Sequence, residues 1–214
     1  THVIQSDSAV GAIGDAEYGY KTWQLNAENT SEFKGEGWEH YLTYRVQGIY
    51  QDRVAFTTIN PNVAETPISA HPEGTDMRLG LFAQDEFIWN DKLTIITGAR
   101  GDFVWQEAEI TNAAQVPVQN FAFSPKIAAM YDFTDNFSVF GSVAHTERLP
   151  SLDELYQYSG TRTPSPDLEK EGANNFEAGI ALNGTDLLFD GDTGALKLTG
   201  FYSDIDNLIV ANPS

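Results

Sequence analysis

The feature that most constrains the fold is a two-residue alternation that runs through unusually long segments. In residues 93–103, Leu93 and Ala99 belong to an uncharged set of positions, while Arg100 and Asp102 belong to the other set. Side chains in a strand point alternately to the two faces of a sheet, so this segment predicts a strand with one apolar and one polar face. About eight segments show this pattern, near residues 22–33, 39–52, 77–89, 93–103, 124–133, 137–147, 174–182 and 195–203.

The predicted strands are long, and their connections alternate in length. Most exceed the ~5–6 residues usual in soluble sheets, and several reach the ~9–11 residues that a tilted strand needs to cross a bilayer. Short turns lie near 34–37, 90–92 and 134–136. Long polar segments lie at 53–76, 104–123 and 148–173. This asymmetry is typical of outer-membrane barrels, although the last connection, 183–194, is longer than a tight turn.

Large aromatic residues gather beside the short turns. They are Phe33, Trp38, Phe87, Trp89, Tyr131, Phe133 and Phe137. Membrane barrels place such rings at the water interface, where an apolar ring body and a polar rim both find a match. The alternative is ordinary cross-strand packing of hairpin aromatics. Taken with strand length and turn asymmetry, these positions favour an all-β fold, an antiparallel transmembrane β-barrel.

In such a barrel the charged positions face an enclosed polar lumen, and the stripe that contains Leu93 faces lipid. The predicted lumen-facing polar residues are Arg45, Arg78, Arg100, Asp102, Lys126 and Glu177. An arginine on the lipid face near mid-membrane costs ~2–4 kcal/mol, so the polar face should not turn toward lipid. One strand fits poorly, because Asp85 shares a face with Leu81 and Trp89. A β-bulge near Gln84 would restore the alternation.

Composition and motifs exclude several classes of function. The 214-residue chain has 31 acidic and 12 basic residues and a net charge of -19, which disfavours nucleic acid as a partner. No apolar run reaches the ~18 residues of a membrane helix. Cysteine is absent, which excludes disulfides and thiolate metal sites. Since we find no G-x-S-x-G elbow, P-loop or H-E-x-x-H motif, we expect no enzymatic activity and no cofactor.

Four stretches resemble the barrel of TonB-dependent outer-membrane receptors. They are "GLFAQDEFIWNDKLTIITGARGDF", "FSPKIAAMYDFTDNFSVFGSVAHTERLPSLDELY", "PDLEKEGANNFEAGIAL" and "LTGFYSDIDNLI", in the family's order. The resemblance implies a 22-stranded barrel with a plug domain. It also implies a bacterial outer-membrane location, contact with membrane lipid, binding of an iron chelate or heme protein from outside, and energy from the TonB complex through the plug.

The chain departs from a whole receptor of this kind. About eight strands are visible, with no plug domain and no terminal aromatic residue. We therefore expect residues 1–214 to be an internal part of a single β-barrel domain, about eight strands of the larger barrel. The edge strands of such a part carry unpaired backbone groups, which need partners in lipid and invite association in water.

The resemblance also indicates a substrate class. "ERLPSLDELYQYSGTRTPSPDL" stands where heme and hemoglobin receptors of this family carry their FRAP and NPNL boxes, with residues 148–150 and 165–168 matching parts of them. Those receptors usually place a histidine ligand between the boxes. This sequence has none there, which leaves two tyrosines, and tyrosine can ligate heme iron. The substrate-binding candidates in the predicted outer loops are Tyr156, Tyr158, Arg148 and His71.

Several alternatives remain open at this point. Pro150 and Tyr156 could instead only shape the loop. The candidate metal ligands are His2, His71, Glu73 and Asp76, since imidazole with carboxylates suits zinc, iron or nickel. Ligand spacing such as His-x3-His is absent, which favours solvated loop residues. His40 sits beside a short turn, and His145 ends a strand on the apolar face.

Three functions are consistent with these patterns. The first is energised uptake of an iron chelate such as a siderophore or heme. The second is passive diffusion through a porin. The third is a soluble β-sandwich that binds glycans or mediates adhesion, and it predicts that the apolar stripe packs against a second sheet.

Overall fold

The computed structural model describes residues 2–9, 12–58, 66–67, 71–109, 117–158, 163–185 and 189–210. Side chains are described for residues 18–55, 71–108, 117–158, 163–185 and 189–210. The strands are β1 (His2–Ala9), β2 (Ala12–Gly35), β3 (Trp38–Thr58), β4 (Thr66–Pro67), β5 (Glu73–Trp89), β6 (Leu93–Glu109), β7 (Val118–Thr134), β8 (Phe137–Arg148), β9 (Glu171–Thr185) and β10 (Thr193–Asp206). A short helix, α1 (Leu152–Tyr156), lies between β8 and β9. No helix in the described part of the chain is long and apolar enough to cross a membrane.

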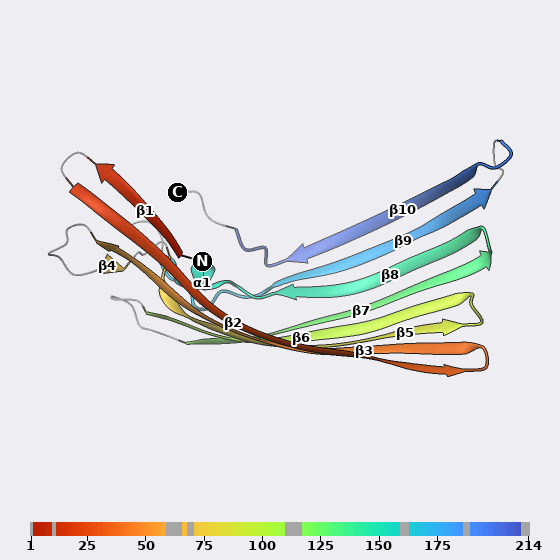
Figure 1. The fold of residues 1–214 in the computed structure, drawn as a ribbon, viewed down its shortest axis with the longest axis horizontal. Helices are drawn as coiled ribbons and strands as arrows, with labels where there is room; N and C mark the ends of the chain where they lie inside the picture. Colours follow the sequence, from red (N-terminus) through yellow and green to blue (C-terminus); the bar gives the residue numbers. More distant parts are fainter. Residues whose placement is uncertain are drawn as a thin grey trace.

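The strands form one antiparallel sheet that curls along its width (Figure 1). Its order is β1-β2-β3-β5-β6-β7-β8-β9-β10, with β4 paired to β3. All eight predicted strands are present, as β2, β3 and β5 to β10. The all-β, antiparallel prediction is therefore confirmed. Among the described residues, β1 and β10 are the two ends of this order and do not pair with each other.

The strands are longer than the sequence patterns indicated. β2 has 24 residues, β3 has 21, and β5, β6 and β7 have 17 each. A 17-residue strand spans ~56 Å, or ~43 Å across a membrane at a tilt of ~40°. This exceeds the ~30 Å hydrocarbon core, so the strands continue into water. The predicted long loops at 53–76 and 104–123 were accordingly too long.

The three turns predicted to be short, between β2 and β3, β5 and β6, and β7 and β8, lie at one end of the sheet, at the right in Figure 1. Asn90 and Asp91 adopt left-handed φ values of 50° and 54°, and Gly37 has φ 74°. Glycine, asparagine and aspartate tolerate this conformation best, which explains why these residues occupy the turns. The backbone N–H of Asn90 donates to the carbonyl of Gly37 at 2.8 Å, so neighbouring turns also bond to each other.

The strand register separates two faces of the sheet. Helix α1 packs on the face that carries Ala108, which we call the inner face. Alternation along β6 puts Arg100 and Asp102 on this face too, and Leu93 and Ala99 on the opposite, outer face. Cross-strand pairing places all six predicted lumen-facing residues on the inner face.

The outer face is apolar and uncovered. No second sheet covers it within the described ranges. Trp23 and Leu25, for example, are each 74% exposed. A soluble protein seldom leaves such a continuous apolar surface open, whereas a bilayer would cover it. The β-sandwich alternative required a second packed sheet, and the described sheet does not have one.

The aromatic residues predicted beside the short turns form a band on the outer face. We call these seven residues, Phe33, Trp38, Phe87, Trp89, Tyr131, Phe133 and Phe137, the aromatic band. Trp38 lies opposite Trp89, and the ring centroids of Tyr131 and Phe133 are 4.8 Å apart in an edge-to-face contact. The band lies where a membrane barrel places its interfacial girdle.

The β-bulge that would restore the alternation near Gln84 is not present. The pairing of β5 with β3 and with β6 runs without a register shift through this residue. Asp85 therefore stays on the outer face, opposite Leu42. Its carboxylate gains a partner instead, since His40 Nδ1 lies 2.7 Å from Asp85 Oδ2. A side-chain pair, rather than a change in the backbone, accommodates the acid on this face.

Candidate ligand-binding site on the inner face

The connection between β8 and β9, predicted as a polar loop, contains helix α1. The backbone N–H of Glu154 donates to Ser151 Oγ at 3.3 Å, and the N–H of Ser151 donates to Glu154 Oε2 at 2.8 Å. This capping box satisfies N–H groups that a helix start otherwise leaves unpaired. The Ser-x-x-Glu pattern is visible in the sequence, so this helix start was detectable there.

Helix α1 packs on the inner wall through a small apolar core. Its members are Ala108, Val118, Leu152, Leu155 and Tyr156, with Tyr158 and Leu168 packed against it. The side chain of Leu155 is fully buried. The carbonyl of Leu155 also accepts the N–H of Ser165 at 2.7 Å, which holds the following loop to the helix. The described parts of the loop that the resemblance connected with substrate, 148–158 and 163–168, therefore pack together on the inner wall.

Tyr156, predicted to bind substrate, lies within this core. It is 1% exposed, and its hydroxyl donates to the carbonyl of Gln106 at 3.5 Å. Burial, together with the negative charge of Glu107, raises the pKa of the Tyr156 phenol. A tyrosine ligates iron through its deprotonated oxygen, which this environment disfavours. The position agrees with the loop-shaping alternative, whereas Tyr158, at the edge of the core, is only partly buried.

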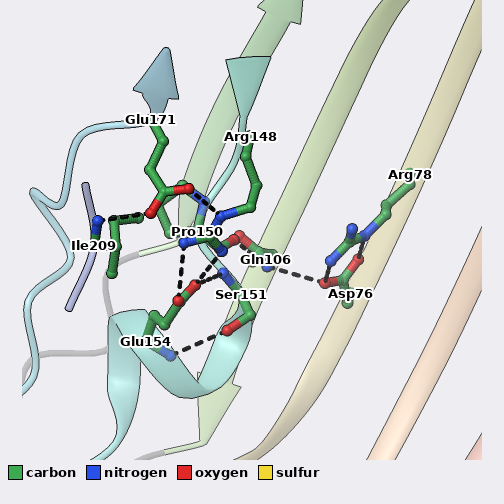
Figure 2. A network of polar contacts seen from close by, with 9 residues as sticks. All are labelled: Asp76, Arg78, Gln106, Arg148, Pro150, Ser151, Glu154, Glu171 and Ile209. Carbon is green, nitrogen blue, oxygen red and sulfur yellow. Dashed lines mark hydrogen bonds and ion pairs between the residues drawn. The ribbon is translucent and has the colours of Figure 1, made fainter. Parts of the chain in front are cut away.

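Arg148, also predicted to bind substrate, holds the loop together (Figure 2). Its Nε donates to Glu171 at 2.5 Å, and its Nη1 and Nη2 donate to Glu154 at 2.9 and 3.1 Å. Glu171 also accepts the backbone N–H of Ile209 at 2.6 Å. We call these four residues the Arg148 clamp. It joins the end of β8, helix α1, the start of β9 and the segment after β10.

The Arg148 clamp should loosen in acid. Hydrogen bonds from Arg148 and then from the Ile209 backbone lower the pKa of Glu171 from 4.5 to about 2. Burial opposes ionisation of Glu154, but hydrogen bonds from Arg148 and Ser151 outweigh it and lower that pKa too. A carboxyl group whose pKa is lower in the folded than in the unfolded protein stabilises the fold at pH values above its unfolded pKa. This stabilisation is lost as the pH falls from about 4.5 toward 2.

Hydrogen exchange of the α1 amides, corrected for the intrinsic pH effect, measures this loosening. We expect protection of α1 to fall as the pH is lowered across that window. In Glu171→Gln the fall should be smaller, because one of the two titrating partners of Arg148 is removed. The same pH dependence in this variant and in the unchanged protein would contradict the assignment.

A buried glutamine connects the start of the β8–β9 loop to the strands of the inner wall. Gln106, 2% exposed, donates through Nε2 to Asp76 Oδ2 at 2.9 Å and to the carbonyl of Pro150 at 3.3 Å. Asp76 in turn accepts two hydrogen bonds of 2.7 Å from Arg78 (Figure 2). This network fixes the start of the loop relative to β5 and β6.

The charged side chains of the inner face that lie farther from helix α1 also pair with one another. Arg100 donates to Asp102 at 2.7 and 2.6 Å and to Gln47 at 3.1 Å. Gly80 makes room for this pair, because a Cβ there would lie 2.7 Å from the Arg100 guanidinium. Arg45 forms an ion pair with Glu28. The arginines predicted to face the lumen thus have partners within the wall.

A second cluster brings a histidine to the side of α1. His71 Nδ1 lies 3.8 Å from Asp153 Oδ1, and its ring meets the Tyr18 ring edge-to-face at 5.4 Å. Asp153 also accepts a hydrogen bond of 2.8 Å from Arg53, whose guanidinium lies 5.5 Å from the Tyr20 ring centre. The loop has no histidine between its two boxes, but the fold places one beside it from the β4–β5 connection.

Among the described residues, the candidate metal ligands are not assembled into a site. The described residues hold no group of three or more histidine, aspartate or glutamate side chains suited to a metal ion. Glu73 accepts the backbone N–H of Ala55 at 3.1 Å, and Asp76 is occupied by Arg78 and Gln106. The side chain of His2 lies outside the described part of the chain.

Sequence reasoning missed most residues that build this site. They are Arg53, Gln106, Asp153, Glu154 and Glu171. Only Glu154 had a local signal, its capping-box spacing to Ser151. Arg53 and Asp153 are 100 residues apart in the chain, and no local pattern predicts their contact.

A curled antiparallel sheet with an apolar outer face, short turns at one end and a polar inner face defines an outer-membrane β-barrel wall. The sequence matches the family described as "TonB dependent receptor-like, beta-barrel" over residues 3–214. The chain belongs to this family of Gram-negative outer-membrane transport receptors.

Two curated relatives are both called TonB-dependent heme receptor A. The protein of Haemophilus influenzae (strain 86-028NP) is 24% identical over 218 residues, covering 91% of this chain and 29% of the relative. That of Haemophilus ducreyi (strain 35000HP) is 25% identical over 207 residues, covering 86% and 28%. The chain thus spans less than a third of these relatives.

Solved structures show the same fold. The Serratia marcescens hemophore receptor HasR, in complex with its hemophore HasA and heme, has a TM-score of 0.74 at 19% identity, covering 92% of this chain and 34% of HasR. The ferric-catecholate import receptor Fiu of E. coli K12 has a TM-score of 0.62 at 17% identity, covering 94% and 33%. Identities this low support the shared fold alone.

Proposed function

We propose that this chain is part of a receptor for energised, TonB-dependent uptake of heme or another iron chelate. Family membership and the names of the relatives support this substrate class. The structural observation that carries the proposal is the position of His71, a half-exposed imidazole beside helix α1, 3.8 Å from the Asp153 carboxylate.

His71 has the features of a group that binds an iron-containing substrate. Neutral imidazole is a common ligand of iron. His71 Nδ1 makes no hydrogen bond among the described residues. The rings of Tyr18 and Tyr20 add flat surfaces near His71. Tyr158, in the connection between β8 and β9, is a second candidate for binding the substrate. Arg53 positions Asp153 rather than binding substrate, because it is 8% exposed and already bonded.

The remaining partners follow from family membership and are part of the proposal. Residues 1–214 supply part of a single barrel domain whose outer face contacts outer-membrane lipid. A plug domain elsewhere in the receptor would close the lumen and connect it to the TonB complex. The inner-face charges Lys126 and Glu177, for which no ion pair is found among the described residues, are the candidates for contact with that plug.

Replacing His71 by alanine in the full-length receptor should weaken heme binding about tenfold or more, since losing one iron ligand costs at least ~1.4 kcal/mol. Titration of the heme absorption band measures the affinity. The matched control is His145→Gln, because His145 lies on the outer face, where it bonds to Asn174. Equal affinity of the His71 variant and the unchanged receptor would contradict the proposed role.

Growth on a single iron source tests the transport class itself. A deletion strain complemented with the receptor should grow on heme only while the TonB complex is intact. Growth that continues without that complex would indicate a passive porin. Growth on a ferric siderophore but not on heme would assign a different chelate to the same site.

A further inference from the structure

The pairing of β7 with β8 ends partway up the sheet, although both strands continue. The antiparallel ladder between them ends at the pair formed by Lys126 and Ala144. Above this pair, β7 stays in register with β6 up to its first residue, and β8 stays in register with β9 up to its last. We call the stretch beyond the end of the ladder, residues 118–125 of β7 and 145–148 of β8, the β7–β8 seam.

Pro125 explains where the ladder ends. Successive N–H groups along a strand point to opposite neighbours. The N–H of Asp132 donates to the Lys92 carbonyl on the β6 side, so the odd-numbered residues of β7 point toward β8. Proline has no N–H and occurs in sheets where no ladder donor is needed. Pro125, next to the last pair, therefore removes the next donor toward β8 and ends the ladder there.

Side chains take the place of the ladder across the seam. The N–H of Phe123 donates to Glu147 Oε2 at 2.7 Å, and the N–H of Glu147 donates to Ser124 Oγ at 3.1 Å. Lys170, from the segment before β9, donates to the same Glu147 oxygen at 2.6 Å and to the carbonyl of Phe121 at 3.1 Å. The register, if continued, would set Phe123 opposite Glu147. Backbone groups of these two residues thus bond to side chains where a ladder would join strands.

The ties across the seam are weaker than a ladder. The side chains of Glu147 and Lys170 are 15% and 39% exposed, and ion pairs open to water add little stability. Helix α1 adds a second tie on the inner face, because the chain enters it from β8 while it packs against Ala108 of β6 and Val118 of β7. Local opening occurs where protected backbone hydrogen bonds are few. The wall should therefore separate more easily at the seam than at the neighbouring ladders.

We propose that the β7–β8 seam is a hinge in the barrel wall. Above Lys126, the upper part of β8 moves away from β7 together with β9 and β10, while the ladder below stays closed. Glu147 and Lys170 hold the seam closed at rest, and α1 limits the movement from the inner side. Each opening breaks the side-chain bonds to the backbone of Phe123 and Phe121 and exposes these groups to water.

Hydrogen exchange of single amides in the full-length receptor, embedded in lipid nanodiscs, tests this movement. The N–H of Phe123 faces the seam, whereas those of Ala122 and Ser124 face the continuous ladder with β6 at the same height. After correction for intrinsic rates, we expect the Phe123 amide to exchange at least ~10 times faster than the other two, because only the seam opens locally. Equal exchange of the three amides would mean that the seam stays closed and would overturn the proposal.

Lys170→Met removes the ammonium but keeps an unbranched side chain. The Phe123 amide should then exchange about tenfold faster, as for the loss of one charge-assisted hydrogen bond, while the Ala122 amide keeps its rate. Lys92→Met makes the same change at an exposed residue of a short turn and should leave both rates unchanged. A Phe123 rate that is unchanged in Lys170→Met, or equally raised in Lys92→Met, would refute the role of Lys170 in closing the seam.

Pro125→Ala tests the cause of the seam from the opposite direction. The alanine N–H supplies the missing donor, so the ladder should extend upward. The Phe123 amide should exchange about fivefold more slowly, as for one net backbone hydrogen bond, and a general loss of stability cannot produce this slowing. An unchanged or faster rate would show that Pro125 does not open the seam. The comparison of amides in the unchanged receptor decides whether the hinge exists even if a variant fails to assemble.

Discussion

Ala99→Arg will block assembly of the receptor in the outer membrane. Ala99 lies on the outer face near the middle of β6, opposite Ala83 on one side and Pro125 on the other. A guanidinium at this level would stand in hydrocarbon at a cost of ~2–4 kcal/mol. Heat-modifiable mobility on a gel separates the assembled barrel from the unfolded chain and measures the effect.

Arg100→Ala is the matched control for this prediction, because the residue is adjacent in sequence but points to the inner face. The variant loses the bonds to Asp102 and Gln47, which are partly exposed to the lumen, so the loss in stability is small. We expect the variant to assemble normally. Equal assembly of both variants would show that the two faces are assigned the wrong way or that neither meets lipid.

Leu155→Ala will release helix α1 from the inner wall while leaving the barrel assembled. Leu155 is fully buried between the helix and the strands, and removing such a side chain costs ~2–5 kcal/mol. Five helical residues cannot persist alone in water, so the helix depends on this packing. Asp153 would then no longer be held beside His71.

Protease digestion of the assembled receptor measures this release. The variant should be cut within residues 149–170 at least ~10 times faster than the unchanged receptor, since opening becomes easier by ~1.4 kcal/mol or more. Asp167→Ala, at an exposed residue of the same loop, is the control and should leave the rate unchanged. An unchanged rate in Leu155→Ala would mean that the apolar core does not hold the loop.

Local sequence patterns predicted the β-sheet of this protein and its two faces well. The alternation around Arg100 identified the strands and their facing, and the lengths of the connections indicated that the short turns share one end of the sheet. The aromatic band followed from the positions of rings beside those turns. The Asp85 strand was the exception, because alternation alone could not show that His40 on the next strand would compensate the acid.

The sequence by itself determined the class of fold, because side-chain direction in a strand repeats every two residues and can be recognised from neighbouring residues. Only the tertiary structure decided the ligand-binding site. The contacts of His71 and Arg53 with Asp153, and the burial of Tyr156, depend on strand register and on how one connection folds back over the sheet. These contacts join residues far apart in the chain, and no periodic pattern in the sequence predicts them.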